Sequence, residues 1–268
     1  LVTDRADRLG RPGGRPPAEA LGEGGPVADA AARETRWLLT TSGTTGLPKV
    51  VPHTLATLSR SVSRLESGPP PTWGLLYDPT RFAGLQVVLQ ALVGGGALAL
   101  ADTAQPLPAQ VAQLAEAGVT ALSATPTLWR RLLMAPGAAR LPLRQATLGG
   151  EVADQATLDA LRLAFPGARV THIYASTEAG VGFSVRDGRA GFPAGFLDAA
   201  APGGVRLSLR DGILWVRPPL PSPAEGRSAA VEVDAEGFVR TGDRVRVEGD
   251  RALFLGRDSG AVNVGGVK

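Results

Sequence analysis

The sequence predicts an α/β fold, in which a helix-covered parallel or mixed sheet is followed by a small antiparallel β-rich subdomain. Between residues 37 and 174, short apolar runs alternate with segments whose apolar residues recur at helical spacing. After about residue 184, short strands separated by turn residues replace this alternation. With 44% hydrophobic and 20% charged residues, the 268-residue chain has the composition of a globular protein that buries a sizeable core.

The first 34 residues are predicted to form a flexible lead-in, because glycine and proline punctuate them throughout. Residues 1–15 are charged and lack the apolar stretch of a signal peptide, so we expect a cytoplasmic protein. An α/β core is predicted over residues 35–184 and a β-rich subdomain over residues 185–256. Residues 257–268 are predicted to be a hinge and the start of a further domain.

Strands and helices of the α/β core are predicted from apolar runs, caps and stop signals. Thr54 and Asp154 are expected to cap helices, and Pro126 follows Thr125 at a first helical position. The expected strands cover residues 36–40, 73–77, 97–101, 119–124, 145–148 and 168–173. The expected helices cover residues 54–65, 83–93, 107–117, 125–133 and 154–165.

The β-rich part is predicted from turn chemistry. Asp211-Gly212 separates the apolar runs 205–209 and 213–216, which is typical of a two-residue hairpin. Further short strands are expected at residues 231–233, 238–240, 245–247 and 252–255.

Composition excludes several kinds of function. The chain has no cysteine, which excludes disulfides, thiolate metal sites and a cysteine nucleophile, and its two histidines disfavour a multi-histidine metal site. A net charge of +3 with scattered arginines does not indicate nucleic-acid binding. Since no run of 18 apolar residues occurs, no membrane span is predicted.

The segment 40–49 is the most informative stretch of the chain. It reads Thr-Thr-Ser-Gly-Thr-Thr-Gly-Leu-Pro-Lys and lies between a predicted strand and a predicted helix. A polyphosphate is bound by backbone amides that glycine leaves accessible, by hydroxyl groups and by a cation, and this segment has all three. The spacing is not that of a Walker loop, because Lys49 lies three residues after Gly46. The alternative is a flexible polar turn.

This loop resembles the phosphate-binding loop of the adenylate-forming superfamily, which includes acyl- and aryl-CoA ligases and peptide-synthetase adenylation domains. Residues 174–178, Tyr-Ala-Ser-Thr-Glu, resemble the family's Tyr-Gly-x-Thr-Glu motif, with alanine in place of the usual glycine. Residues 241–243, Thr-Gly-Asp, followed by Gly-Arg-Asp at 256–258, resemble its ribose-binding motif and hinge. The three motifs occur in the family's order, and the resemblance covers roughly residues 37 to 268.

The resemblance implies a role for each matching residue. Thr177 would contact the α-phosphate and Glu178 would bind Mg²⁺, while Asp243 and Arg257 would hold the ribose and Tyr174 would pack on the adenine. Read alone, Glu178 could be a solvated carboxylate and Asp243 a turn cap. The β- and γ-phosphates of ATP would be held by Thr41, Ser42, Gly43, Thr44, Thr45, Gly46 and Lys49. Lys49, Thr177 and Glu178 would be the catalytic residues.

The resemblance also implies a pocket for the acid. Gly149, Gly150 and Glu151 would line the adenine and acyl pocket, although they could form a plain strand-to-helix turn. His172 would line the same pocket or be an ordinary buried histidine. Arg81 and Phe82 occupy the place of the family's acyl gate, where many CoA ligases carry a histidine at the position of Arg81. Arg81 would pair with a second anionic group on the substrate, or lie on the surface.

The expected function is therefore activation of a carboxylic acid with ATP and Mg²⁺ to an acyl-adenylate. Transfer would follow to CoA or to phosphopantetheine on an acyl carrier protein. The alternatives are a catalytically incompetent module that binds a nucleotide or acyl-adenylate, and an amino-acid-activating adenylation domain. Family members continue into a mobile C-terminal domain with a catalytic lysine, whereas the only lysines here are Lys49 and Lys268. We therefore expect a truncated form with impaired turnover.

Overall fold

The computed structural model describes residues 35–41, 48–63 and 68–258, all of which belong to one compact unit. Its central element is a six-stranded sheet with the strand order β4-β3-β5-β6-β7-β8. Neighbouring strands are parallel except β7 and β8, which are antiparallel. The strands are β3 (Thr72–Leu75), β4 (Ala97–Leu100), β5 (Ala121–Ala124), β6 (Gln145–Gly149), β7 (Arg169–Ser176) and β8 (Gly180–Val185). The predicted mixed sheet is therefore confirmed.

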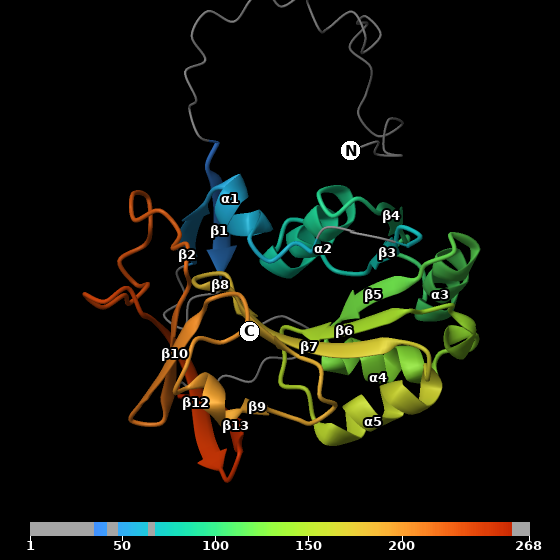
Figure 1. Cartoon of the computed structure of the whole chain (residues 1–268). Helices are drawn as coiled ribbons and strands as arrows, with labels where there is room; N and C mark the ends of the chain where they lie inside the picture. The colour runs from blue at the N-terminus through green and yellow to red at the C-terminus, as the bar shows by residue number, and fades with distance from the viewer. Residues whose placement is uncertain (1–34, 42–47, 64–67, 259–268) are drawn as a thin grey trace, which may run out of the picture. The chain divides into compact units, whose positions relative to one another are not determined.

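Helices cover both faces of this sheet (Figure 1). Helices α3, α4 and α5 pack on one face, where buried side chains such as Leu114, Trp129 and Leu158 form one cluster with the strands. On the other face α2 packs against β3 and α1 packs against α2. Their bounds are α1 (Leu55–Ser59), α2 (Phe82–Leu92), α3 (Leu107–Glu116), α4 (Pro126–Met134) and α5 (Gln155–Ala164), with 3-10 turns at Ala138–Arg140 and Ala194–Phe196. None of the helices within the described ranges is long and apolar enough to cross a membrane.

The predicted helix starts are confirmed by their caps. The side chain of Thr54 accepts a hydrogen bond from the backbone nitrogen of Thr57 at 3.2 Å. Asp154 accepts one from Thr157 at 2.7 Å, and Thr125 accepts one from Leu128 at 3.1 Å. Each bond satisfies a backbone N–H that the first helical turn leaves without a partner.

A five-stranded antiparallel sheet forms the β-rich part, in the order β10-β11-β12-β13-β9. Its strands are β9 (Phe192–Pro193), β10 (Arg206–Arg210), β11 (Ile213–Arg217), β12 (Val239–Glu248) and β13 (Arg251–Arg257). The predicted hairpin is confirmed: Asp211 and Gly212 take φ angles of 50° and 74°, as a type I′ turn requires. The strands predicted at 238–240 and 245–247 belong to the single strand β12, whose register shifts between Arg244 and Val245.

Three further differences concern the predicted elements. Residues 231–233 do not form a strand, and only Val233 makes an isolated bridge, to Val239. The loop at 40–49 does not lead straight into a helix, because Lys49–His53 form a strand, β2, that pairs antiparallel with β1 (Trp37–Thr41). Helix α1 ends at Ser59 rather than at residue 65.

The hydrophobic core of the antiparallel sheet also includes residues from earlier in the chain. Val51 of β2 and Phe183 of β8 belong to the same buried cluster as Leu214 and Val245. Strand β7 contributes to both cores, because Val170 packs with the helices α3–α5 and Tyr174 packs with the β-rich cluster. The boundary between 184 and 185 stays a prediction.

Candidate functional site: the β7–β8 turn and its surroundings

The turn between β7 and β8 carries Thr177 and Glu178, two of the predicted catalytic residues. Glu178 accepts a long hydrogen bond of 3.4 Å from the hydroxyl of Thr41, at the end of β1. The backbone nitrogen of Ala179 donates to Ser176 Oγ at 3.0 Å, which closes the turn. The structure thus brings together the start of the predicted phosphate loop and the predicted metal ligand, which lie 137 positions apart in sequence.

Lys49 lies directly opposite Thr41 in the β1–β2 hairpin. Directly opposite residues of an antiparallel pair place their side chains on the same face of the sheet. Because Thr41 reaches Glu178 from that face, Lys49 begins on the side of the hairpin that faces the β7–β8 turn. The intervening predicted phosphate-binding residues, Ser42, Gly43, Thr44, Thr45 and Gly46, lie outside the described residues.

Asp243, on β12, is held by two other predicted site residues. The hydroxyl of Tyr174 donates to Asp243 Oδ2 at 2.6 Å, and Arg257 Nη1 lies 3.3 Å from Asp243 Oδ1. Arg257 also donates to the carbonyl of Thr241 at 2.7 Å. Burial, together with the neighbouring Asp243 carboxylate, raises the pKa of Tyr174 well above its ordinary value. The hydroxyl therefore remains a hydrogen-bond donor at neutral pH.

The ring of Tyr174 has two aromatic neighbours. Phe183 and Phe254 stack against it, with ring centroids 5.3 Å and 5.1 Å away and planes tilted by only 18° and 14°. Near-parallel rings at these distances are in offset stacking contact with the tyrosine ring. Tyr174 can contribute to a nucleoside site through its hydroxyl and Asp243, and the packing of an adenine on its ring stays a prediction.

Gly149, Gly150 and Glu151 lie at the carboxyl end of β6, as predicted. The carboxylate of Glu151 accepts a hydrogen bond from the backbone nitrogen of Thr127 at 2.9 Å, at the start of α4. The hydroxyl of Tyr77 donates to the carbonyl of Gly149 at 3.3 Å, and burial raises the pKa of Tyr77. Tyr77 follows β3, and the strand order reverses between β3 and β5, where open α/β sheets bind ligands.

Tyr77 begins the segment that resembles the family's acyl gate, but the sequence predicted no role for this tyrosine itself. Its position directly after an apolar strand was a signal, but the contact with Gly149 joins residues 72 positions apart and depends on the fold.

The other residues predicted for an acid pocket make different contacts, and the pocket itself stays a prediction. The Arg81 side chain is 64% exposed and lies 3.9 Å from the carboxylate of Asp78 in the same loop, which favours the surface alternative. Phe82 packs on His53, with ring centroids 5.7 Å apart, close to Thr177. His172 is buried, and its Nε2 lies 3.1 Å from the carbonyl of Arg189. Burial lowers the pKa of His172, which matches the alternative of an ordinary buried histidine.

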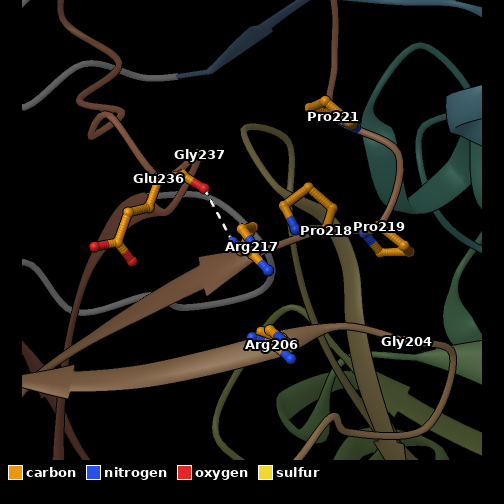
Figure 2. Close-up of a pocket in the computed structure, with 8 residues that line it drawn as sticks. All are labelled: Gly204, Arg206, Arg217, Pro218, Pro219, Pro221, Glu236 and Gly237. Carbon is orange, nitrogen blue, oxygen red and sulfur yellow. Dashed lines mark hydrogen bonds between the residues drawn. The ribbon is translucent and has the colours of Figure 1, made fainter.

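A cavity of about 360 Å³ lies elsewhere, at the end of the β10–β11 hairpin (Figure 2). Arg206 and Arg217 line it together with Pro218, Pro219 and Glu236. None of the predicted site residues lines this cavity. The candidate site therefore consists of the side chains around the β7–β8 turn and around Asp243.

The chemistry of the turn suits a hard cation bound together with phosphate. Mg²⁺ takes oxygen ligands and is bound in many nucleotide sites by one or two carboxylates plus phosphate oxygens. Glu178 supplies a carboxylate, and the hydroxyls of Thr41 and Thr177 add oxygen atoms in its neighbourhood. Across the described ranges, no group of three or more histidine, aspartate or glutamate side chains could hold a metal by itself.

Comparison with known proteins identifies the family. The model of one protein family, described as AMP-binding enzyme, matches residues 4–211. The chain belongs to the AMP-binding enzyme family. No curated protein sequence matches the chain significantly.

Solved structures of adenylate-forming enzymes have the same fold as this AMP-binding chain. An NRPS protein containing adenylation and PCP domains is 24% identical with a TM-score of 0.69, covering 86% of this chain and 52% of the other. ATP-bound MatB from Rhodopseudomonas palustris is 22% identical with a TM-score of 0.65, covering 82% and 47%. E. coli MenE, bound to an analogue of OSB-AMS, is 25% identical with a TM-score of 0.60, also covering 82% and 47%. The chain thus spans about half the length of these structures.

Proposed function

We propose that this chain provides the ATP site for activation of a carboxylic acid to an acyl-adenylate. The carboxylate would attack the α-phosphorus of ATP, forming the acyl-adenylate and releasing pyrophosphate. The observation that carries the proposal is the contact between Thr41, at the edge of the predicted phosphate loop, and Glu178. Membership of the AMP-binding family and the structural likeness to adenylate-forming enzymes support it.

The chemistry explains why these residue types are needed. Carboxylate and triphosphate are both anions, so catalysis depends on positioning and on neutralising charge. In the proposed site Lys49 and the glycine- and hydroxyl-rich loop hold the β- and γ-phosphates, and Thr177 contacts the α-phosphate. Glu178 would hold Mg²⁺, which would supply positive charge to offset the negative charge of the phosphates. Asp243, oriented by Tyr174 and Arg257, would bind the ribose hydroxyls.

The acceptor of the acyl group is proposed to be a thiol, either of CoA or of phosphopantetheine on a carrier protein. The structural likeness to an NRPS protein with a PCP domain supports the carrier, and the likeness to the anthranilate CoA ligase AuaEII supports CoA. Asp78 weakly resembles the aspartate with which amino-acid-activating members of the family bind the substrate's amino group. Its carboxylate accepts hydrogen bonds from Thr80 within its own loop, so it gives that alternative no support.

ATP–pyrophosphate exchange tests the proposal over a panel of aryl, fatty, dicarboxylic and amino acids. We expect Mg²⁺-dependent exchange with one class of acid and its loss in Glu178→Gln and Lys49→Met. Glu225→Gln is the matched control, because that carboxylate is exposed and pairs only with Arg36 among the ion pairs of the described residues. Binding of ATP without exchange for any acid would instead support a nucleotide-binding module. Absence of ATP binding would contradict both.

A further inference from the structure

His53 is a buried histidine that the proposed function does not use. It is the last residue of β2, is 2% exposed, and contacts two other elements through its two ring nitrogens. Its Nε2 lies 2.8 Å from the backbone carbonyl oxygen of Thr177. Its Nδ1 lies 3.1 Å from the hydroxyl oxygen of Thr57 on α1. The ring therefore bridges α1 and the β7–β8 turn.

The partners of His53 determine its tautomer. A carbonyl oxygen only accepts hydrogen bonds, so Nε2 carries the proton and donates to Thr177. In the neutral ring Nδ1 is then an acceptor, and the single hydroxyl proton of Thr57 is shared between it and the carbonyl of Thr54, 3.0 Å from the same hydroxyl. Burial lowers the pKa of His53, which favours the neutral ring at pH 7.

The same turn is also held on its other side. Arg60, directly after α1, donates to the carbonyl of Val181 at 2.7 Å. His53 and Arg60 therefore bind the backbone on both sides of Glu178, at Thr177 and Val181. The ring of Phe82 lies against His53, with centroids 5.7 Å apart, which limits the orientations that the imidazole can take. The backbone of the turn is thus fixed to β2 and α1, the elements that follow the predicted phosphate loop.

We infer that His53 is a positioning residue: by holding the Thr177 carbonyl, it aims Thr177 and Glu178 at the phosphates of the bound nucleotide. This inference rests on the proposed function. One hydrogen bond, between residues 124 positions apart in sequence, would thus align the β7–β8 turn with β2, the strand that follows the predicted phosphate loop. Tyr174, Asp243 and Arg257 lie outside this arrangement, because their contacts join β7, β12 and β13.

A positioning role and a purely structural role of His53 predict different effects of its replacement on ligand binding. A histidine that only fills space would, when replaced, weaken all ligands together by loosening the fold. A positioning residue would, when replaced, weaken the ligands that use the triphosphate and Mg²⁺, and leave the binding of adenosine unchanged.

The test compares two amides that mimic different ring nitrogens. The amide nitrogen of His53→Gln can replace Nε2 and reach the Thr177 carbonyl, whereas the shorter His53→Asn replaces only Nδ1. The matched control is His172→Asn, because His172 is also buried and also contacts a backbone carbonyl through Nε2. Affinities for Mg²⁺–ATP and for adenosine are measured by calorimetry on the full chain, with circular dichroism as the check of folding.

We expect His53→Asn to weaken Mg²⁺–ATP binding about tenfold, the effect of losing one hydrogen bond to a placed polar group, with adenosine affinity unchanged. His53→Gln should lie within about threefold of wild type, and His172→Asn should not change either affinity. Equal loss for both ligands, or unchanged Mg²⁺–ATP affinity in His53→Asn, would overturn the inference. A wild-type chain that binds neither ATP nor adenosine would overturn the proposed function, and the inference with it.

The nitrogen shifts of the His53 ring in the wild-type protein provide a measurement that does not depend on a folded variant. They should report the Nε2–H tautomer, with Nδ1 unprotonated. The Nδ1–H tautomer would overturn the inference, because its Nε2 could not donate to Thr177.

Discussion

Replacing Arg251 with methionine should destabilise the protein more than any surface arginine replacement. The Arg251 side chain, on β13, is only 7% exposed and makes five hydrogen bonds. Two go to the carboxylate of Asp187, at 2.6 Å and 3.1 Å. Three go to the backbone carbonyls of Arg189, Ala190 and Gly191, at 2.7 Å, 2.8 Å and 3.1 Å. The guanidinium therefore joins β13 to the segment that follows β8.

The expected loss in free energy of unfolding follows from the Asp187 charge that the substitution leaves without its arginine. Removing one partner of a buried ion pair costs about 3–5 kcal/mol, because the other charge loses its compensation. The Asp187 side chain is 38% exposed, so water offsets part of that loss and we expect about 3 kcal/mol. Arg189→Met is the control: its pair with Asp250 joins side chains that are 53% and 74% exposed, and such pairs contribute about 0–1 kcal/mol.

Urea unfolding followed by tryptophan fluorescence measures both free energies. A difference below about 1 kcal/mol between Arg251→Met and Arg189→Met would refute the reasoning. A second readout is the titration of Asp187. Burial alone would raise the pKa of this carboxyl, but the hydrogen bonds from Arg251 and from the Arg189 backbone lower it. In Arg251→Met the pKa of Asp187 should rise, which carboxyl NMR shifts would detect.

Three further outcomes can be measured. Tyr174→Phe removes the donor that lies 2.6 Å from Asp243, so adenosine affinity should fall about fivefold in calorimetry, without a change in the Mg²⁺ dependence of ATP binding. Burial lowers the pKa of His53 and His172, so the unfolded chain binds more protons below about pH 6.5. The free energy of unfolding should have its full value above that pH and fall as the pH drops through the folded pKa values. In His172→Gln this free energy, measured by urea unfolding, should depend less steeply on pH. Arg81→Ala should not change the ranking of acids in pyrophosphate exchange, because that side chain is exposed; selective loss for dicarboxylic acids would place Arg81 in the acid pocket.

The parts of the fold that depend on local chemistry were predictable from the sequence. Thr54, Thr125 and Asp154 cap helices through residues only three positions away, so their neighbours are visible in the sequence. Strand β2 was missed because Pro52 interrupts its short apolar run, and proline in a strand is tolerated mainly at edges. Strand β8 was missed because two glycines weaken its pattern.

The candidate site was only partly predictable, because its contacts are non-local. Thr177, Glu178, Asp243 and Arg257 were expected on the basis of motifs, and the structure pairs Asp243 with Arg257 and brings Glu178 to Thr41. The exposure of Arg81 and the aromatic contacts of Tyr174 with Phe183 and Phe254 depend on packing between distant segments, about which residue spacing carries no information.

The side chains of β7 belong to two hydrophobic cores, which limits where segments of this chain can be exchanged with those of a related enzyme. Tyr174 at the end of this strand stacks on Phe183 of β8 and on Phe254 of β13, so three segments must keep mutually fitting aromatic rings. In chimeras of this chain with a related enzyme, a crossover between β8 and β10 would combine rings from different parents. We expect such chimeras to fold poorly unless residues 174–183 and 251–257 come from the same parent.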